Sequence, residues 1–191
     1  MCCVYLSLSY SLDLRMSGVY WSVTALSLLR PHDAVMQAMR VYSQQQQQQS
    51  SSTDSESKKL SILDWVFACF DKATGGFAGN SGGQDGHLLY TLSAIQILAL
   101  ADRLHDPRLQ RERVIQFCVS LQQPDGSFAG DAWGEIDTRF TYCALSTLSL
   151  LGALERVDVT QAAHYIMACR NLDGGFGCVI GAESHAGTCR G

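Results

Sequence analysis

A repeated glycine-aromatic turn, with a period near fifty residues, constrains the fold of this chain more than any other sequence feature. The turn occurs three times, and its phenylalanines lie 51 and 48 residues apart: Phe77, Phe128 and Phe176. Each turn follows an apolar segment and precedes, by nine to eleven residues, a polar residue that opens another segment: His87, Asp137 or Arg139, and His185. A unit of two helices and one glycine-rich return cannot bury its apolar face alone, so it must stack on its neighbours.

The predicted helices are of two kinds. Residues 88–104 and 140–151 are apolar on nearly every side, which indicates buried helices. Residues 108–121 and 159–170 carry one apolar stripe and one polar face, which indicates outer helices. Inner and outer helices that alternate at this period predict two concentric layers. The expected fold class is therefore all-α, an α-α toroid.

Start and stop signals accompany these segments. Asp106 and Pro107 offer an N-cap and a proline at the first helical position. Asp158 with Gln161 resembles a capping box, and Gly152 suits the position just after a helix end.

A low-complexity segment interrupts the first repeat. Residues 43–59 are a glutamine run followed by serine and charge, with nothing to bury. We expect a disordered insertion or a mis-called exon between helices near 14–29 and 60–70, and a partner-binding role is the alternative. The predicted domain organisation is an irregular segment over 1–13 and a partial toroid over 14–42 and 60–191.

Composition narrows the class of protein. The charged fraction of 17% is low, and a formal charge of −4 without a basic run argues against nucleic acid as a partner. Eight cysteines form no CxxC pair, and several lie in apolar segments where free cysteine behaves as a small hydrophobe. No stretch is long and apolar enough to span a bilayer, and the N-terminus lacks the basic region of a signal peptide. We expect a reduced, cytoplasmic protein.

Four strings of residues resemble the β subunits of protein prenyltransferases. They are LRMSGVYW at 14–21, DGHLLYTLSA at 85–94, DGSFAGDAWGEIDTRF at 125–140, and DGGFGC at 173–178 followed by ESHAG at 183–187. The last two are most similar to the type II (Rab) geranylgeranyltransferase. The resemblance covers residues 14–29 and 60–187, and the strings occur in the family's order.

The resemblance implies transfer of a geranylgeranyl group from its diphosphate to C-terminal cysteines of Rab proteins. An apolar funnel has to hold the C₂₀ tail, because each buried methylene group contributes about 0.8 kcal/mol. The candidates for its lining are Tyr90, Trp133, Phe140 and Tyr142, and plain core packing is the alternative for each. Ser17 and Gly18 on the first helix are candidates for setting the depth of the pocket.

The resemblance also implies a set of ligands for the diphosphate: His185, Ala186, Gly187 and Arg139. The family histidine that matches His185 donates to the diphosphate, and Gly187 keeps the approach clear. The family arginine that matches Arg139 points into the central cavity. Arg139 opens an otherwise apolar inner helix, and a buried arginine needs a partner. We therefore expect it to pair with Glu135, with Asp137 or with a charged ligand.

Zinc is the family's cofactor, and it activates the acceptor thiol by lowering its pKa. In the family an Asp and a Cys two residues apart, in a later repeat, hold the metal together with a later His. None of these matches this chain, so we expect no metal site in it and no complete catalytic set. The sequence departs from the family after Gly187, with about half of the six-hairpin barrel present. We expect a truncated chain that is poorly soluble and inactive alone.

The implied partners are a prenyltransferase α subunit and a Rab protein presented by an escort protein. Two other functions stay open. One is a non-catalytic interaction fragment that occupies the α subunit. The other is a terpenoid cyclase, because residues 122–128 resemble the Gln-Trp repeats of those toroids, although neither a DxDD nor a DDxxD cluster is present.

Overall fold

The computed structural model describes residues 15–45, 61–82 and 85–187. Their helices, in chain order, are α1 Arg15–Leu29, α2 His32–Gln45, α3 Ile62–Ala68, α4 Leu88–Leu100, α5 Arg111–Ser120, α6 Thr138–Leu150, the short 3₁₀ helix η3 Leu154–Arg156 and α7 Val159–Ala168. None of the helices in the described part is long and apolar enough to cross a membrane.

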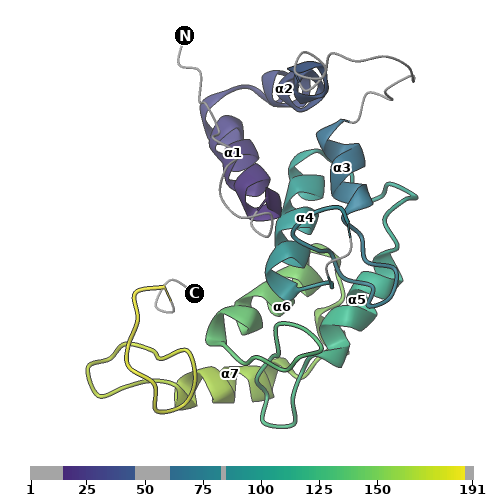
Figure 1. Cartoon of the computed structure of the whole chain (residues 1–191). Coiled ribbons are helices and arrows are strands. Elements are labelled where there is room, and N and C mark those ends of the chain that lie inside the picture. The colour runs from purple at the N-terminus through teal and green to yellow at the C-terminus, as the bar shows by residue number, and fades with distance from the viewer. Residues whose placement is uncertain (1–14, 46–60, 83–84, 188–191) are drawn as a thin grey trace.

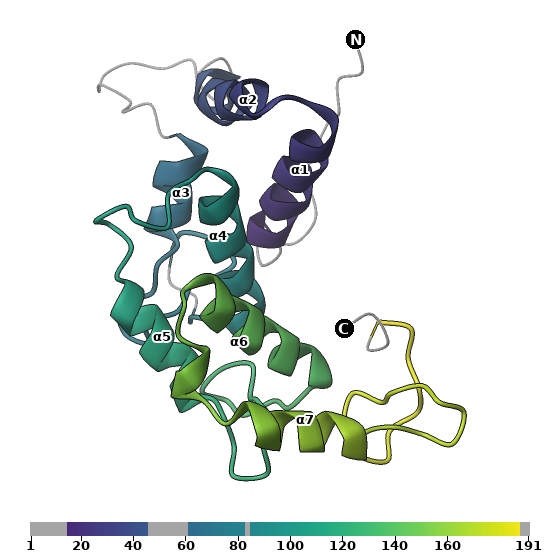
Figure 2. The same ribbon diagram turned by 180° about the vertical axis from the view of Figure 1, so that it is seen from behind.

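The helices form two layers of an open arc (Figure 1). In the inner layer α4 packs against both α1 and α6, while α5 and α7 pack on α6 from outside. Figure 2 shows α3, α5 and α7 along the outer side, and the arm of residues 171–187 continuing from α7 at the end of the arc away from α1. The predicted alternation of inner and outer helices is confirmed.

Burial explains why the inner helices lack an amphipathic pattern. Helix α4 buries residues on several sides, among them Leu88, Ala94 and Leu98, because neighbours cover it from two directions. Helix α6 is different, because residues 139, 142, 149 and 150 along one of its faces are exposed.

The three glycine-aromatic turns fold alike. In each, the N–H of the residue directly after the phenylalanine donates to the carbonyl of the residue that caps the preceding helix: Ala78 to Cys69 (2.9 Å), Ala129 to Leu121 (3.0 Å) and Gly177 to Cys169 (3.0 Å). The first two turns also pack on the outer helix that follows them, α5 and α7 respectively. Gly75 has a φ of 91°, and a Cβ there would lie 2.8 Å from the carbonyl oxygen of Arg113 in α5.

The repeats are joined by a second set of equivalent bonds. An N–H in the first two residues of each inner helix donates to a carbonyl in the next repeat's turn: Met16 to Gly79 (3.0 Å), Leu88 to Gly130 (2.8 Å) and Thr138 to Cys178 (2.8 Å). Each inner helix therefore begins against the turn that follows it in the chain.

Of the three predicted cap signals, one is confirmed in full, one in part, and one is wrong. Asp158 caps α7 by accepting from the N–H of Gln161 (2.8 Å). The Gln161 side chain donates instead to the Pro124 carbonyl (3.2 Å), so the expected capping box is only half formed. Gly152 follows α6 with a φ of 60°, as predicted.

The outer helix predicted over residues 108–121 does not start at Asp106, so that prediction is wrong. Helix α5 begins at Arg111, and Asp106 instead accepts from the N–H of Arg108 (3.0 Å) in a local turn. An aspartate stabilises a turn as readily as a helix start, and here the buried Leu109 holds the loop against the core.

The expected boundary at residue 43 is also wrong. Helix α2 starts after Pro31 and continues to Gln45, so the first residues of the glutamine run complete this helix. The rest of the predicted insertion lies outside the described residues, as do segments 1–13 and 188–191.

Candidate functional site

The polar residues predicted at equivalent repeat positions have equivalent roles. Nδ1 of His87 accepts from the N–H of Leu89 (3.1 Å), and a carboxylate oxygen of Asp137 accepts from that of Arg139 (2.8 Å). Nδ1 of His185 accepts in the same way from Gly187 (3.0 Å). His87 and Asp137 are thereby the N-caps of α4 and α6.

Arg139 lies at the start of α6 and pairs with Asp137. Its Nε donates to Oδ1 (3.0 Å) and its Nη2 to Oδ2 (2.6 Å), which confirms the expected pairing. The hydrogen bond with Asp137 raises the pKa of Arg139. The expectation that this arginine is buried is wrong, because its side chain is 50% exposed while that of Asp137 is 7% exposed. The exposed face of α6 leaves the guanidinium at the surface.

His87 lies beside Arg139 in a crowded aromatic setting. Its ring contacts Phe140 edge-on at 5.1 Å between centroids and Tyr90 at 5.7 Å. A Cβ on Gly130 would lie 2.5 Å from its Nε2. Burial lowers the pKa of His87. The charges of Asp131 and Glu135 oppose this shift, and the charge of Arg139 adds to it. The ring is therefore neutral near pH 7, with Nδ1 accepting and the proton on Nε2.

The four predicted lipid-pocket residues lie in different environments. Phe140 is a core residue with 1% exposure, and Tyr90 packs partly buried against the core and His87. Tyr142 and Trp133 are 53% and 83% exposed, and the Trp133 indole N–H donates to Oδ2 of Asp85 (3.2 Å). The structure thus places Tyr90 and Phe140 each against the His87 ring, and the lipid role of all four stays a prediction.

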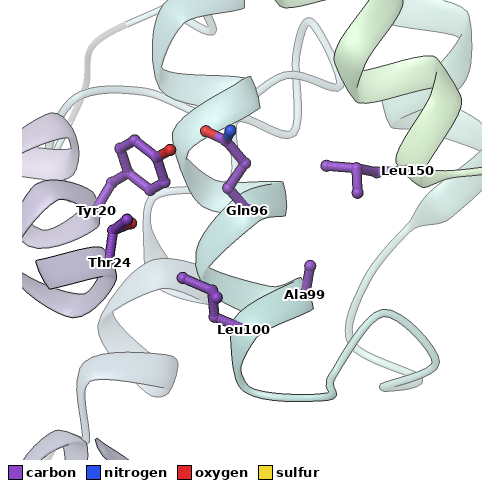
Figure 3. A pocket seen from close by; sticks show the side chains of 6 residues that line it. All are labelled: Tyr20, Thr24, Gln96, Ala99, Leu100 and Leu150. Carbon is purple, nitrogen blue, oxygen red and sulfur yellow. The ribbon is translucent and has the colours of Figure 1, made fainter. Parts of the chain in front are cut away.

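An open hollow of ≈ 230 Å³ lies between the inner helices (Figure 3). It is lined by Tyr20, Thr24, Gln96, Ala99, Leu100 and Leu150. Sequence reasoning missed it because each of the three helices contributes only a few residues. The one available signal was small or polar side chains within otherwise apolar helices. Gly18 lies two residues before Tyr20 on α1, and a Cβ there would meet no atom within 4 Å.

The predicted diphosphate ligands His185, Ala186 and Gly187 are exposed on the arm that follows α7. The N–H of His185 donates to the carbonyl of Phe176 (3.1 Å), as that of His87 does to Phe77 (3.0 Å). The arm therefore repeats the local geometry that precedes α4.

The described residues do not fit a zinc site. Within residues 15–45, 61–82 and 85–187, no three His, Cys, Asp or Glu side chains are grouped to hold a metal ion. Four of the five free cysteines in this part of the chain are buried: Cys69, Cys118, Cys143 and Cys169. Burial raises the pKa of the Cys118 thiol to about 12, which keeps it protonated.

Comparison with known proteins gives consistent matches. The model of the prenyltransferase alpha-alpha toroid domain matches residues 3–190. The chain is 42% identical over 182 residues to the geranylgeranyl transferase type-2 subunit beta of Candida albicans, covering 91% of this chain and 47% of the relative. It is 40% identical over 174 residues to the geranylgeranyl transferase type-2 subunit beta of Saccharomyces cerevisiae, covering 91% of this chain and 46% of the relative.

Among solved structures, the chain is similar to Candida albicans protein geranylgeranyltransferase-I complexed with GGPP. The TM-score is 0.66 at 16% identity, and the match covers 93% of this chain and 47% of the other. At this identity the match supports the fold alone. The chain spans about half the length of the relatives it matches.

Proposed function

The chain belongs to the family of the prenyltransferase alpha-alpha toroid domain, and we propose that it serves as part of the β subunit of a type-2 geranylgeranyl transferase. The predicted family and toroid fold are confirmed. The observation that carries the finer proposal is the identity of 40–42% to two type-2 β subunits across 91% of the chain. The proposed reaction transfers geranylgeranyl from its diphosphate to C-terminal cysteines of Rab proteins.

Two features of the inner layer support a site for an isoprenoid diphosphate. The hollow between α1, α4 and α6 has a mainly apolar lining, which suits a hydrocarbon tail. Arg139 lies at the N-terminus of α6, where the helix dipole also favours an anion. We assign Arg139 and the predicted residues His185, Ala186 and Gly187 to the diphosphate. Because Nδ1 of His185 accepts from Gly187, Nε2 is the ring nitrogen that carries a proton to donate.

Activation of the acceptor thiol is not assigned to residues of this chain. The family's zinc would supply a thiolate at neutral pH, but the described residues offer no fitting donor set. We therefore propose that this chain alone does not catalyse the transfer. The proposal also includes a prenyltransferase α subunit and a Rab protein with its escort protein as partners, and a cytoplasmic location.

Ligand binding tests the proposal directly. Isothermal titration calorimetry with geranylgeranyl diphosphate should show saturable binding, weakened by His185→Ala and by Arg139→Gln. A folded chain that does not bind this ligand would overturn the assignment. Co-purification with a prenyltransferase α subunit and the absence of zinc in the purified chain, measured by metal analysis, are the further expected results.

A further inference from the structure

The inner layer of the arc has one uncovered helix face at each of its two edges (Figure 1). Helix α4 lies between α1 and α6 and packs on both, so the contact between two inner helices occurs twice within the chain. Among the described residues, α1 and α6 each have such a neighbour on one side only. The two contacts inside the chain therefore show what each edge lacks.

Helix α1 exposes an apolar stripe, which we call the α1 face. Trp21 and Leu28 are 67% and 81% exposed, and Ala25 between them is exposed as well. Their spacing of four and then three residues places these side chains on one side of the helix. A tryptophan and a leucine in water on the same side of a helix mark a surface suited to a protein contact.

The equivalent position in the other inner helices is buried. The hydrogen bonds that join the repeats start at equivalent residues and so align the three inner helices. By this alignment Trp21 corresponds to Ser93 in α4 and Cys143 in α6, which are only 6% and 3% exposed. Helices α4 and α6 each have an inner helix before them, and in the described part of the chain α1 has none. The α1 face is therefore the place where a preceding inner helix packs.

Helix α6 has the opposite uncovered side, which we call the α6 face. Tyr142 and Ser149 are exposed and Ser146 between them is partly exposed, again at spacings of four and three residues. Tyr142 corresponds to Leu92 in α4, which is 5% exposed because a following inner helix, α6, packs on α4. The α6 face is therefore the place where a following inner helix packs.

The third glycine-aromatic turn also lacks the neighbour that the first two turns have. A Cβ on Gly126 would collide with the carbonyl of Gln161, the third residue of α7, and Gly75 lies in the same way against the third residue of α5. Gly174 has a similar φ of 84°, but a Cβ there would meet only the Arg170 side chain, 4.0 Å away. The edge that carries the α6 face thus lacks an inner and an outer helix together.

We infer that two copies of this chain associate head to tail, with the α1 face of each copy packed on the α6 face of the other. A second copy brings an inner helix, α1, together with an outer helix, α3, in the order that the free edge lacks. The bulky side chains of the α1 face meet the serines of the α6 face, so the two surfaces complement each other in size.

The arc shape suits a closed pair rather than an open array. A head-to-tail contact forms a ring where its rotation closes, and a filament where it does not. The chain spans about half the length of the toroid-family relatives that it matches, so two copies supply the length of one relative. Two half arcs joined at both edges therefore close as a dimer.

Sedimentation velocity on the full chain tests the dimer. The unmodified chain should sediment as one species of twice 20.9 kDa. Leu28→Asp on the α1 face and Ser149→Lys on the α6 face should each weaken dimerisation by more than about tenfold, because each buries a charge in the contact. Both positions are exposed within one copy, so circular dichroism should show both variants folded. Val159→Asp is the control, because this exposed apolar residue begins the outer helix α7, and the dimer should persist.

Mixing the two variants tests the head-to-tail order. A pair of one Leu28→Asp copy and one Ser149→Lys copy has one contact without any substitution. In its other contact the introduced carboxylate and ammonium lie close together, because residue 28 aligns with residue 150. The equimolar mixture should therefore regain the dimer, whereas a contact between two like faces would respond to only one of the variants.

Four results would each overturn the inference. They are an unmodified chain that stays monomeric at about 100 μM, species larger than a dimer, a dimer insensitive to either substitution, and a mixture that remains monomeric. In the first case the two faces serve a different protein or further residues of a longer chain. A monomeric chain that binds geranylgeranyl diphosphate would leave the proposed function standing while this inference fails.

Discussion

Arg111, the first residue of α5, donates from Nη2 to the backbone carbonyl of Leu151, the C-cap of α6. Its neighbours on α5 reach in other directions: Glu112 pairs with Arg156 of η3, and Arg113 donates to the carbonyl of Lys72 in the first turn. Three consecutive residues at the start of one outer helix thus contact three separate segments.

The Arg111 contact predicts a stability effect. Arg111→Met keeps the aliphatic stem but removes the donor and the positive charge at the end of α6. We expect a loss of about 1 kcal/mol in the free energy of unfolding, measured by urea titration. Arg103→Met is the control, because this exposed arginine donates no side-chain hydrogen bond to the described residues, and it should change stability by less than about 0.5 kcal/mol.

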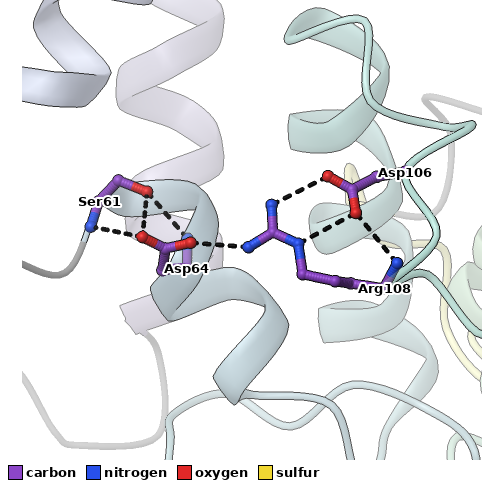
Figure 4. A network of polar contacts seen from close by, with 4 residues as sticks. All are labelled: Ser61, Asp64, Asp106 and Arg108. Atoms are coloured by element: carbon purple, nitrogen blue, oxygen red, sulfur yellow. Dashed lines mark hydrogen bonds and ion pairs between the residues drawn. The ribbon is translucent and has the colours of Figure 1, made fainter.

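A polar network joins α3 to the loop before α5 (Figure 4). Arg108 bridges Asp106 and Asp64, and Asp64 completes a capping box with Ser61. The hydrogen bond from Arg108 lowers the pKa of Asp64, and that of Asp106 falls to about 2, again chiefly through Arg108.

This network predicts a pH dependence. Both carboxyls have folded-state pKa values below their unfolded values, so their stabilisation is present above a pH of about 4 and is lost as pH falls towards 2. Urea unfolding should therefore show Arg108→Met less stable than the unmodified chain at pH 6, with the gap narrowing as pH falls from 4 towards 2. A gap that stayed constant over this range would show that the ion pairs do not cause it.

Replacing a core aromatic residue should cost far more stability than replacing an exposed one. Phe77 has no exposed surface, and its replacement by alanine should cost about 3–5 kcal/mol through lost burial and a cavity. Trp133 is 83% exposed, and Trp133→Ala should stay within about 0.5 kcal/mol of the unmodified chain. Thermal melts followed by circular dichroism measure both, and similar losses would contradict the assignment of Phe77 to the core.

Two glycines with similar backbone angles separate conformational strain from packing. Gly126 and Gly134 have φ values of 90° and 86°, but a Cβ would collide with the Gln161 carbonyl only at Gly126. Gly134→Ala should cost about 1–2 kcal/mol from the left-handed conformation alone. Gly126→Ala should cost clearly more, because the second turn would have to move away from α7. Equal losses would show that the turn and α7 do not need close contact.

The sequence predicted the layered fold well because its signals repeat. The Gly-Phe turns indicated the order of the helices, and the near-uniform apolarity of α4 indicated that this helix is buried. Asp158 indicated the start of α7, and Gly152 indicated the end of α6. The helix start predicted at Asp106 was wrong because an aspartate followed by proline suits a turn as well as a helix start. Helix α2 was missed because the glutamine run obscured where its apolar face ended.

The candidate site was less predictable. The Asp137–Arg139 pair could be expected from a cation near carboxylates, but the half-exposed position of Arg139 depends on which face of α6 stays uncovered. That is a property of the packed arc rather than of the local sequence. The hollow combines Tyr20, Gln96 and Leu150, which lie far apart in the chain, so no local pattern marks it.

The bonds that join the repeats run in one direction along the chain. The donors Met16, Leu88 and Thr138 precede their acceptors by 63, 42 and 40 residues. During synthesis each of these donors is therefore made before the carbonyl that accepts from it. In the finished fold, every glycine-aromatic turn accepts a hydrogen bond from the start of the inner helix made before it. A pause in translation between repeats would leave the most recent inner helix with a loose N-terminus.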